Sequence, residues 1–401
     1  MIKPKIIKAY VLKNAIEHNG KAQANSIIPG LFNHGLKKEK IKETIPEINK
    51  ILKQINSLSI DKQKKEFENY KDLIGHRKER QGLPELPNSK KGVIMRFSPS
   101  PSGPLHIGHA LTSSISYLYV KKYGGKFYIR IEDTNPENIY KPAYKMISRE
   151  SKWLFNNKCK IVIQSERMKI YYKYIEKLIK SRNAYICTCD SEKFKELVKN
   201  KKECNCRNLN MEEHKKRWEK MLDKKGYKQG QAVLRFKSNI NHKNIAMRDF
   251  PLARINTHSH PLQKNKYKVW PLMNLAVSVD DIEMKMTHII RAKEHRDNAE
   301  KQKMIYTALG KEKSIPWTGF LGRIHFTDFI LSSSKIRQDI ESGKYKSWDD
   351  PKLPTLASLK KQGYKPQAFW KFAEQIGLNE VDKKIDKKEF LLLLKNFNKN
   401  N

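Results

Sequence analysis

Two histidines around one glycine are the residues of this 401-residue sequence with the clearest chemical potential: His106, Gly108 and His109. They follow a short apolar run at 93–95 and precede an amphipathic segment at 111–123, which predicts a strand, a turn and a helix start. The free N–H groups of a helix N-terminus attract phosphate. Two imidazoles and a glycine at that place would let a triphosphate approach both backbone and side-chain donors, so we expect a nucleotide site here.

Four of the five cysteines form two close pairs, a second arrangement with chemical meaning: Cys187, Cys189, Cys204 and Cys206. In an intracellular chain such pairs favour metal binding over disulfides. Four thiolates suit tetrahedral Zn²⁺, with Zn–S distances near ~2.3 Å, although a CxC pair is tighter than the usual CxxC. Four protein ligands leave no open position for chemistry, so the sequence predicts a structural zinc site. Cys159 is expected in the core.

The net charge of the chain is strongly positive. Lys and Arg total 82 against 42 Asp and Glu, a formal net charge of +40. Such an excess favours a polyanionic partner, because neutralising phosphates releases counterions. The lysine bias of an AT-rich genome produces the same excess, so charge alone does not establish RNA binding. No apolar run approaches the roughly 20 residues of a membrane span and no signal-peptide pattern is present, so we expect a cytoplasmic protein without a membrane partner.

Alternating strand and helix patterns must position these residues. Beyond residue 93, we expect strands at 126–132, 161–164 and 287–291 and helices at 143–156, 168–180 and 295–309. This alternation argues for an α/β fold with a parallel sheet and covering helices. Residues 184–270 interrupt it with the cysteine pairs, a charged helix at 211–223 and β-rich pieces at 231–237 and 249–255. We interpret that stretch as an insertion, and the chain after residue 335 as largely helical.

The first 90 residues have a helical pattern. Apolar positions recur at helical spacing in four segments, 7–18, 23–32, 39–55 and 62–74. We expect interruptions at Gly20, Pro29-Gly30 and Pro46, because glycine and proline weaken a helix interior. A linker with two prolines is predicted at 82–91.

The complete segment 96–110 (RFSPSPSGPLHIGHA) resembles the catalytic core of the class I aminoacyl-tRNA synthetases. Further motifs follow in the order of the archaeal-type glutamyl enzymes, from about residue 6 to about residue 390. The domains that this resemblance implies are an N-terminal helical extension (1–90), a Rossmann-type catalytic domain (91–165 and 272–335), an acceptor-binding insertion with the zinc site (166–271) and a helical stem-contact region (336–401).

The resemblance implies the reaction of ATP, L-glutamate and tRNA to glutamyl-tRNA, AMP and pyrophosphate, with Mg²⁺. A carboxylate attacks the α-phosphate of ATP, and a ribose hydroxyl of tRNA then takes the acyl group. Neither step requires a protein nucleophile, so catalysis must come from positioning and charge stabilisation. His106 and His109 fit as donors to phosphate oxygens. The implied partner is tRNA(Glu), and some members of the family also charge tRNA(Gln).

The second signature of the class is a mobile loop that reads KMSKS or a variant. The candidate is the segment 331–336 (LSSSKI), followed by Arg337. Aligned on the leucine and the first serine, Ser333 takes the place of the usual second lysine, and Lys335 is the nearest cation. The resemblance therefore implies ATP contacts from Ser333 and Lys335, with Lys335 holding the pyrophosphate.

Recognition of a side-chain carboxylate calls for arginine, which forms paired hydrogen bonds with that group. The resemblance maps this role to Arg96 and to Arg291, the arginine of HIIRAKEH. It maps a substrate contact to Ser100, the partner of the α-ammonium group to Glu132 in RIEDT, and a neighbouring contact to Asn274 in MNLAVSVDD.

The amino acid itself depends on further details of these motifs. Trp270 is a substrate-site position where a tyrosine is usual, so either the pocket lacks that hydroxyl or another group supplies it. Glutaminyl enzymes read more like PEPNG and RFDDTNP, whereas this chain has PSPSG and RIEDTNP, which favours glutamate. An unmatched buried arginine costs several kcal/mol, so a charged site can discriminate strongly.

Several alternatives stay open from the sequence. Archaeal-type glutamyl enzymes continue with an anticodon-binding β-barrel where this chain stops, which predicts a fragment, a natural minimal enzyme, or a split enzyme whose barrel is a separate polypeptide. Other functions are a glutaminyl-tRNA synthetase and a paralogue that glutamylates queuosine on tRNA, although the latter usually lacks the N-terminal helices and the segment 349–356 (DDPKLPTL). An inactive RNA-binding module, in view of Ser333, and a small-molecule nucleotidylyltransferase are the alternatives from different classes.

Overall fold

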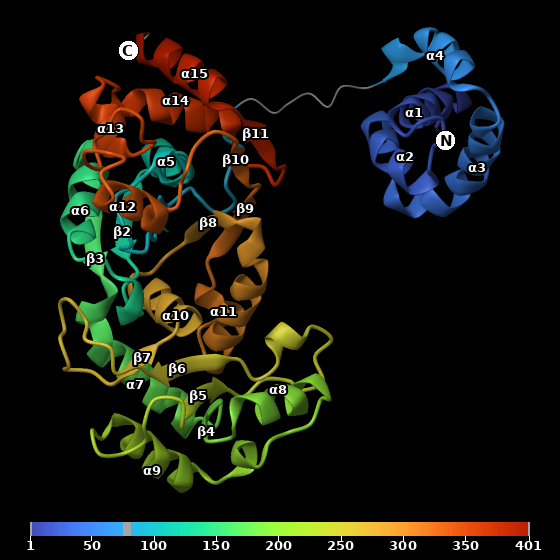
Figure 1. Cartoon of the computed structure of the whole chain (residues 1–401). Coiled ribbons are helices and arrows are strands. Elements are labelled where there is room, and N and C mark those ends of the chain that lie inside the picture. Colours follow the sequence, from blue (N-terminus) through green and yellow to red (C-terminus); the bar gives the residue numbers. More distant parts are fainter. Residues whose placement is uncertain (1, 75–81, 400–401) are drawn as a thin grey trace. The chain divides into compact units, whose positions relative to one another are not determined.

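The structure is a computed structural model that describes residues 2–74 and 82–399. The chain divides into two compact units, Met1–Arg80 and Gln81–Asn401, each of which is described by itself. Figure 1 colours the chain along the sequence and labels the helices and strands. Within the described ranges, no helix has the length and apolar character needed to cross a bilayer.

The first unit consists of helices around one apolar core. The four predicted helices are confirmed as α1 (Pro4–Glu17), α2 (Ala24–Leu31), α3 (Ile41–Asn56) and α4 (Ile60–Glu68), the last followed by a short 3₁₀ turn. Two predicted interruptions are wrong, because α2 continues through Pro29 and α3 through Pro46. Proline removes one backbone hydrogen bond, and the burial of the apolar face of each helix outweighs that loss.

The second unit is built on parallel strands. Strands β1 (Val93–Phe97), β2 (Gly125–Ile131) and β3 (Lys160–Ile163) form one parallel sheet, and β8 (His288–Ala292) pairs in parallel with β9 (Trp317–Leu321). The two sheets adjoin at Thr287, whose N–H donates to the carbonyl of Ile94 at 3.0 Å, while its hydroxyl accepts from the Ile94 N–H at 2.8 Å. The strands therefore run in the order β3-β2-β1-β8-β9. The predicted α/β fold with a Rossmann-type parallel sheet is confirmed.

Helices connect these strands and cover them. They are α5 (Ile107–Tyr123), α6 (Ala143–Leu154), α7 (Met168–Lys180), α10 (Met273–Glu283) and α11 (Arg296–Ala308). Helix α5 begins directly after the turn that follows β1, and it packs against β1 and β2. Because the carboxyl ends of parallel strands meet at one edge, the loop after β1 and the segments after β2 and β8 lie at the same edge of the sheet.

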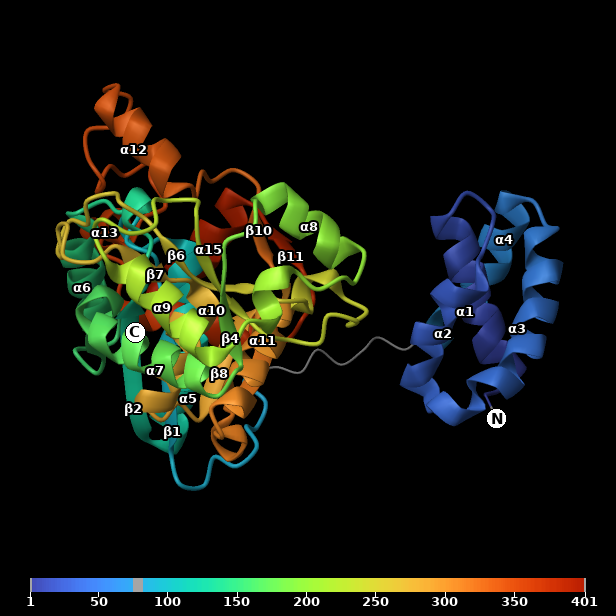
Figure 2. The same cartoon turned by 90° about the horizontal axis from the view of Figure 1, so that it is seen from below.

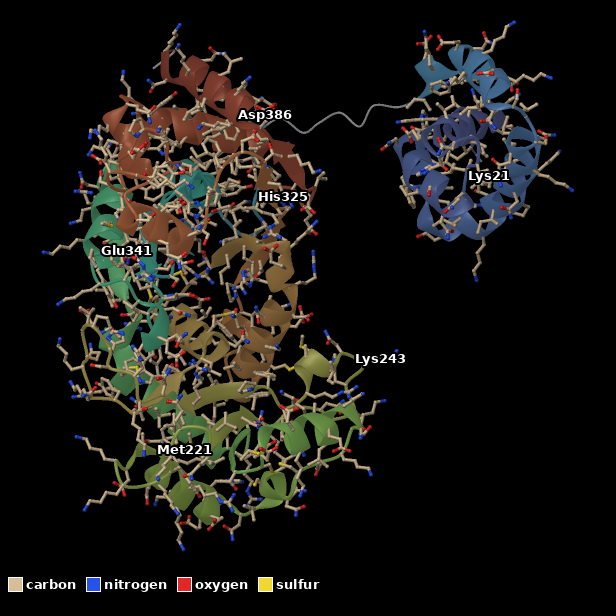
Figure 3. All side chains as sticks on the ribbon, viewed as in Figure 1. Lys21, Met221, Lys243, His325, Glu341 and Asp386 are labelled. Carbon is tan, nitrogen blue, oxygen red and sulfur yellow. The ribbon has the colours of Figure 1, made fainter. Side chains whose placement is uncertain are left out.

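The middle part of the chain forms an antiparallel sheet. It contains β4 (Ala184–Cys187), β5 (Val233–Phe236), β6 (Pro251–Ile255) and β7 (Val269–Pro271) in that order, with α8 (Ser191–Lys199) and α9 (Met211–Leu222) beside it. The predicted strands at 231–237 and 249–255 and the predicted helix at 211–223 are thereby confirmed. Figure 3 labels Met221 and Lys243 in this part, at the end of the unit opposite to Asp386.

The C-terminal residues share the core of the parallel sheet. They form α12 (Ser333–Glu341), α13 (Leu356–Lys361), α14 (Pro366–Ile376) and α15 (Lys387–Lys399), as the helical prediction required. A short strand, β11 (Lys383–Ile385), was not predicted and pairs with β10 (Ile324–Phe326). Helix α14 packs against α5, and Phe369 and Phe390 belong to the same buried cluster as the residues of β1 and β2.

Candidate active site

The histidine motif lies where the first parallel strand passes into its helix. His106 is the N-cap of α5, and its Nδ1 accepts a hydrogen bond from the N–H of Gly108 at 3.2 Å. Because Nδ1 is the acceptor, the proton of the neutral ring resides on Nε2. The motif therefore fixes the tautomer of His106 and leaves one ring N–H as a donor beside the helix N-terminus.

The two histidine rings stack on each other. Their centroids are 3.7 Å apart with an angle of 21° between the planes, and the ring of Phe97 meets His109 edge-on at 5.6 Å. Burial lowers the pKa of His106 well below its usual value, with His109 adding to the effect, and burial lowers the pKa of His109 to about 4. Both rings are thus neutral at pH 7. They can donate hydrogen bonds to an anion, but they bring no positive charge to it.

Backbone contacts from distant segments hold this turn. The N–H of Leu105 donates to Glu150 Oε2 at 2.7 Å, and burial raises the pKa of that carboxyl to about 8. The N–H of Ile107 donates to the carbonyl of Pro354 at 3.0 Å, and the N–H of Leu356 donates to the carbonyl of Leu105 at 2.9 Å. The segment 347–363 therefore pairs directly with the histidine motif, a contact that the sequence did not indicate.

The second signature meets the first. Ser332 caps α12, with its Oγ accepting from the N–H of Lys335 at 3.4 Å. A Cβ placed on Gly103 would lie 2.7 Å from the Cβ of Ser333, and one on Gly108 would lie 3.8 Å from Leu331. Glycine at 103 thus permits a close approach of the two loops. The structure brings Ser333 to the motif that carries the histidines, as the predicted ATP site requires.

Lys335 has a different environment. Its ammonium is 3.4 Å from Asp339 Oδ1 on the same helix, and its side chain is 55% exposed. Lys344 contacts the other oxygen of Asp339 at 3.1 Å. Figure 2 shows α12 standing out from the neighbouring helices, and Figure 3 labels Glu341 at its end. Lys335, the residue predicted to hold the pyrophosphate, is therefore paired with a carboxylate of its own helix.

Two arginines converge on one buried carboxylate. Arg96 on β1 donates from Nε and Nη2 to the two oxygens of Asp281, each at 3.3 Å. Arg130 on β2 donates from Nη1 to the same carboxylate at 2.6 Å. Although burial opposes the shift, the charges of Arg96 and Arg130 hold the pKa of Asp281 below its usual value. Asp281, on α10, thus fixes the predicted substrate arginine in the sheet.

The neighbouring carboxylate has its own set of partners. Asp280 accepts from Arg167 Nε at 2.6 Å, from the hydroxyl of Tyr171 at 2.8 Å and from Gln164 Nε2 at 2.9 Å. Arg130 Nε lies 3.7 Å from it. The adjacent residues Asp280 and Asp281 are therefore both buried, and each faces cations.

Arg291 is the exception in this cluster. Its Nε is buried and has no hydrogen-bond partner among the residues that the structure describes, and no ion pair of those residues includes it. Burial, followed by the charge of Arg96, lowers its pKa to about 10, so it is still a cation at neutral pH. Asp281 and Glu132 attract this cation but form no ion pair with it, so an anionic ligand would supply a direct partner.

The charges of the cluster sum to one positive unit. Its guanidinium groups belong to Arg96, Arg130, Arg167 and Arg291, and its carboxylates to Glu132, Asp280 and Asp281, which gives 4 − 3 = +1. Such a site complements a ligand with a net charge of −1, which is the charge of L-glutamate at neutral pH.

The other predicted amino-acid contacts surround this cluster. Glu132 follows β2, its Oε1 lies 3.5 Å from Arg130 Nη2, and its N–H donates to the carbonyl of Pro99 in the loop after β1 at 2.9 Å. Ser100 lies exposed in that same loop. The structure therefore brings Glu132 and Ser100 to the segment that carries Arg96.

Asn274 and Trp270 precede Asp281 along the chain. Asn274 donates from Nδ2 to Asn298 Oδ1 and accepts from Gln302 Nε2, both at 3.2 Å. Trp270 is 1% exposed and stacks on His260, with centroids 4.9 Å apart and an angle of 17°. Its indole N–H has no partner among the described residues. The tryptophan at this position thus belongs to the core of the antiparallel sheet.

The four predicted cysteines form one cluster, with their sulfur atoms all within 4.8 Å of one another. The distance from Cys187 to Cys204 is 3.9 Å and that from Cys189 to Cys206 is 3.8 Å, which matches the edge of a tetrahedron with metal–sulfur distances near ~2.3 Å. A hydrogen bond from Cys187, despite opposing burial, lowers the pKa of Cys204 to about 5. The cluster is therefore able to hold a metal ion.

Several groups of the site were not predicted from the sequence. Asp280, Asp281 and Arg130 stand in the quoted motifs MNLAVSVDD and RIEDT, but no role was assigned to them. Charged residues at positions where the helix or strand pattern calls for an apolar side chain are the signal that could have found them. Glu150 and Gln302 carried no such signal, because they occur in polar stretches of their helices.

A parallel sheet with a histidine pair at its first helix start, a second loop beside it and a neighbouring cluster of arginines and carboxylates has the features of a class I aminoacyl-tRNA synthetase core. The family model described as tRNA synthetases class I (E and Q), catalytic domain, matches residues 92–397. The chain is 41% identical over 395 residues to the glutamate–tRNA ligase of Methanobrevibacter smithii, covering 98% of this chain and 70% of that protein. It is 42% identical over 377 residues to that of Methanocaldococcus jannaschii, covering 93% and 67%. The chain thus belongs to the class I synthetases for glutamate and glutamine, among the glutamate–tRNA ligases of archaeal type.

Solved structures agree on the fold. The crystal structure of a glutamate–tRNA synthetase from Elizabethkingia anophelis superposes with a TM-score of 0.54 at 23% sequence identity, covering 75% of this chain and 70% of that one. At this identity the match concerns the fold alone.

Proposed function

We propose that this chain activates L-glutamate with ATP, giving glutamyl-adenylate and pyrophosphate, and then transfers the glutamyl group to the 3′ end of tRNA(Glu). The observation that carries this proposal is the half-buried guanidinium of Arg291, whose Nε has no hydrogen-bond partner and which lacks a directly bound counter-charge among the described residues. A side-chain carboxylate would supply that charge, whereas the neutral amide of glutamine would leave it unmatched.

Binding of the amino acid orients its reacting group. Arg291 and the free side of the Arg96 guanidinium would hold the side-chain carboxylate, with Asp281 keeping Arg96 in place. Glu132, Ser100 and Asn274 would take the α-amino end. Held at both ends, glutamate presents its α-carboxylate toward the loop after β1, which leads directly to the histidine motif.

Adenylate formation then depends on stabilising charge on the α-phosphate. The neutral rings of His106 and His109 would donate hydrogen bonds to phosphate oxygens, together with the N-terminal N–H groups of α5. Neutral histidines cannot offset the charge of the leaving pyrophosphate. Lys335 is the nearest cation of the second loop, and we assign it that task, with Ser333 as a further contact. Bound Mg²⁺ would supply additional charge to the phosphates.

Transfer to tRNA uses the rest of the unit. We propose that the insertion at 166–271 contacts the acceptor end and that residues 336–401 contact the stem. The strong positive charge of the chain suits a polyanion. The segment 347–363 pairs with the histidine turn, so tRNA contacts there would lie beside the ATP site.

We further propose that the cysteine cluster holds structural Zn²⁺, which fits four thiolates at these separations. Arg217 Nη1 lies 3.3 Å from the sulfur of Cys206 and would balance the charge of the thiolates. Metal analysis of protein purified without chelators is expected to find about one zinc per chain. A content below a tenth of a zinc per chain would contradict this assignment.

The experiment that tests the function is exchange of labelled pyrophosphate into ATP, run with each amino acid separately and with or without tRNA. We expect exchange with glutamate. Exchange with glutamine instead, or with a small-molecule acceptor alone, would point to the glutaminyl or nucleotidylyltransferase alternatives. No exchange under any condition, combined with tRNA binding, would indicate an inactive RNA-binding protein.

A further inference from the structure

A buried phenol hydroxyl lies in the electrostatic neighbourhood of the arginine cluster. Tyr306 lies on α11, is 2% exposed, and its hydroxyl has no hydrogen-bond partner among the described residues. Buried polar groups in native proteins are almost always paired, so an unpaired hydroxyl asks for an explanation. A ligand that is absent from the free protein would provide one.

Helix packing places Tyr306 next to the predicted substrate residues. Asn298, Gln302 and Tyr306 are spaced four residues apart and share one face of α11, and the first two bind Asn274 at the start of α10. These bonds join the start of α10 to the first half of α11, and the two helices pack along each other, so they run in the same direction. Asp281 lies seven residues after Asn274, about two helical turns further along α10. Tyr306 lies about two turns after Asn298 on α11, so Asp281 and Tyr306 lie at similar heights along the two helices.

The electrostatic environment of Tyr306 agrees with this placement. Burial and then the charge of Asp281 raise its pKa, while Arg96, Arg130 and Arg291 oppose the rise. The hydroxyl therefore lies within the field of the same cluster and keeps its proton at any working pH. It offers a neutral donor close to the unpaired cation.

We propose that the hydroxyl of Tyr306 donates a hydrogen bond to the side-chain carboxylate of bound glutamate, beside Arg291, and is a substrate-binding residue of this site. This inference rests on the proposed function. A carboxylate accepts several hydrogen bonds, so it can satisfy the orphan donors of Arg291 and Tyr306 together. Two of the unpaired donors of the described residues, Arg291 Nε and the Tyr306 hydroxyl, would then share one ligand.

The decisive variant is Tyr306→Phe, which removes only the hydroxyl. A hydrogen bond to a charged group predicts an increase of about 10- to 100-fold in the KM for glutamate, measured by exchange in the presence of tRNA. The KM for ATP is expected to stay unchanged. Since the hydroxyl makes no bond in the free protein, the melting temperature should not fall, and this outcome separates a binding role from a structural one.

Tyr119→Phe is the matched control. Tyr119 is also fully buried, on α5, but its hydroxyl donates to the carbonyl of Pro84 at 2.8 Å, away from the pocket. This variant should lower the melting temperature and leave the KM for glutamate unchanged. Loss of the hydroxyl is thus expected to change the KM for glutamate but not the melting temperature at Tyr306, and the melting temperature but not the KM at Tyr119.

Glutamate binding by calorimetry, again with tRNA present, separates the inference from the function on which it rests. If the wild-type protein binds glutamate and Tyr306→Phe binds it within twofold as tightly, the inference is wrong and the proposed function stands. Equal increases in the KM for glutamate and ATP, together with a lower melting temperature, would also overturn the inference. If the wild-type protein neither binds glutamate nor catalyses exchange, both proposals fail.

Discussion

The amino-acid pocket and the second signature loop would serve the same reaction, yet they are built in opposite ways. In the pocket, Arg96 and Arg130 are buried and held by Asp281, a carboxylate from another element of the fold. In the loop, Lys335 is 55% exposed and pairs with Asp339 on its own helix. The arginines of the pocket are therefore held in place without substrate. Lys335, in contrast, must separate from Asp339 to reach a phosphate. In the proposed reaction, recognition would thus depend on buried residues and leaving-group stabilisation on an exposed one.

The largest effect should come from removing the unpaired cation of the pocket. Arg291→Met is expected to lower kcat/KM for glutamate activation by about 10³-fold, since a desolvated charge pair with substrate is worth about 3–5 kcal/mol. The melting temperature of the same variant should not fall, because Arg291 forms no ion pair among the described residues. Pyrophosphate exchange and calorimetric melting would measure the two quantities.

Arg296→Ala is the control for this variant. Arg296 lies on the neighbouring α11, is half exposed and pairs with Glu380, so its loss should leave glutamate activation nearly unchanged. A decrease of less than tenfold for Arg291→Met would show that the pocket does not depend on that charge.

A second substitution tests the rigidity of the pocket against that of the loop. Asp281→Asn leaves Arg96 and Arg130 buried with a weaker partner, and we expect a loss of about 3 kcal/mol in the free energy of unfolding. Asp339→Asn, whose lysine partners Lys335 and Lys344 are largely exposed, should cost far less. Chemical denaturation measures both. Equal losses would remove the distinction between the two regions.

The loop lysine should affect rate more than binding. Lys335→Ala is expected to slow adenylate formation by about 100-fold, equivalent to about 2.7 kcal/mol of activation free energy, with the KM for glutamate unchanged. Lys344→Ala removes the other cation that contacts Asp339 and should leave the rate near that of the wild type. An unchanged exchange rate for Lys335→Ala would reject its role and direct attention to Arg337.

The smallest effect concerns pH. His109 titrates near pH 6.5 in the unfolded chain and at about 4 in the folded protein, so between these values the unfolded state binds more protons. Stability should therefore rise as the pH increases from about 4 to about 6.5 and level off above. His109→Gln, which keeps a neutral donor, should flatten that rise in melting temperature. A profile identical to that of the wild type would mean that His109 is not held neutral.

Local motifs explain why part of the site was predictable. The histidine turn occupies one continuous segment, 96–110, so its strand, turn and helix start could be predicted from residue types and spacing. The cysteine pairs could also be predicted, because the members of each pair are close in sequence. Arg96 and Arg291 lie nearly 200 residues apart, and only the resemblance to a family joined them. The continuation of α3 through Pro46 was not predictable, because tertiary packing overrode a local preference.

The sequence by itself determined the alternation of strands and helices, the histidine turn at the first helix start and the two close cysteine pairs, because each depends on neighbours along the chain. Only the tertiary structure decided which arginine is paired and which is free. That choice depends on Asp281 approaching β1 and β2 rather than β8, and on Glu150 and Pro354 meeting the histidine turn. Such contacts join elements far apart in the chain, and they are fixed by the packing of whole helices against the sheet.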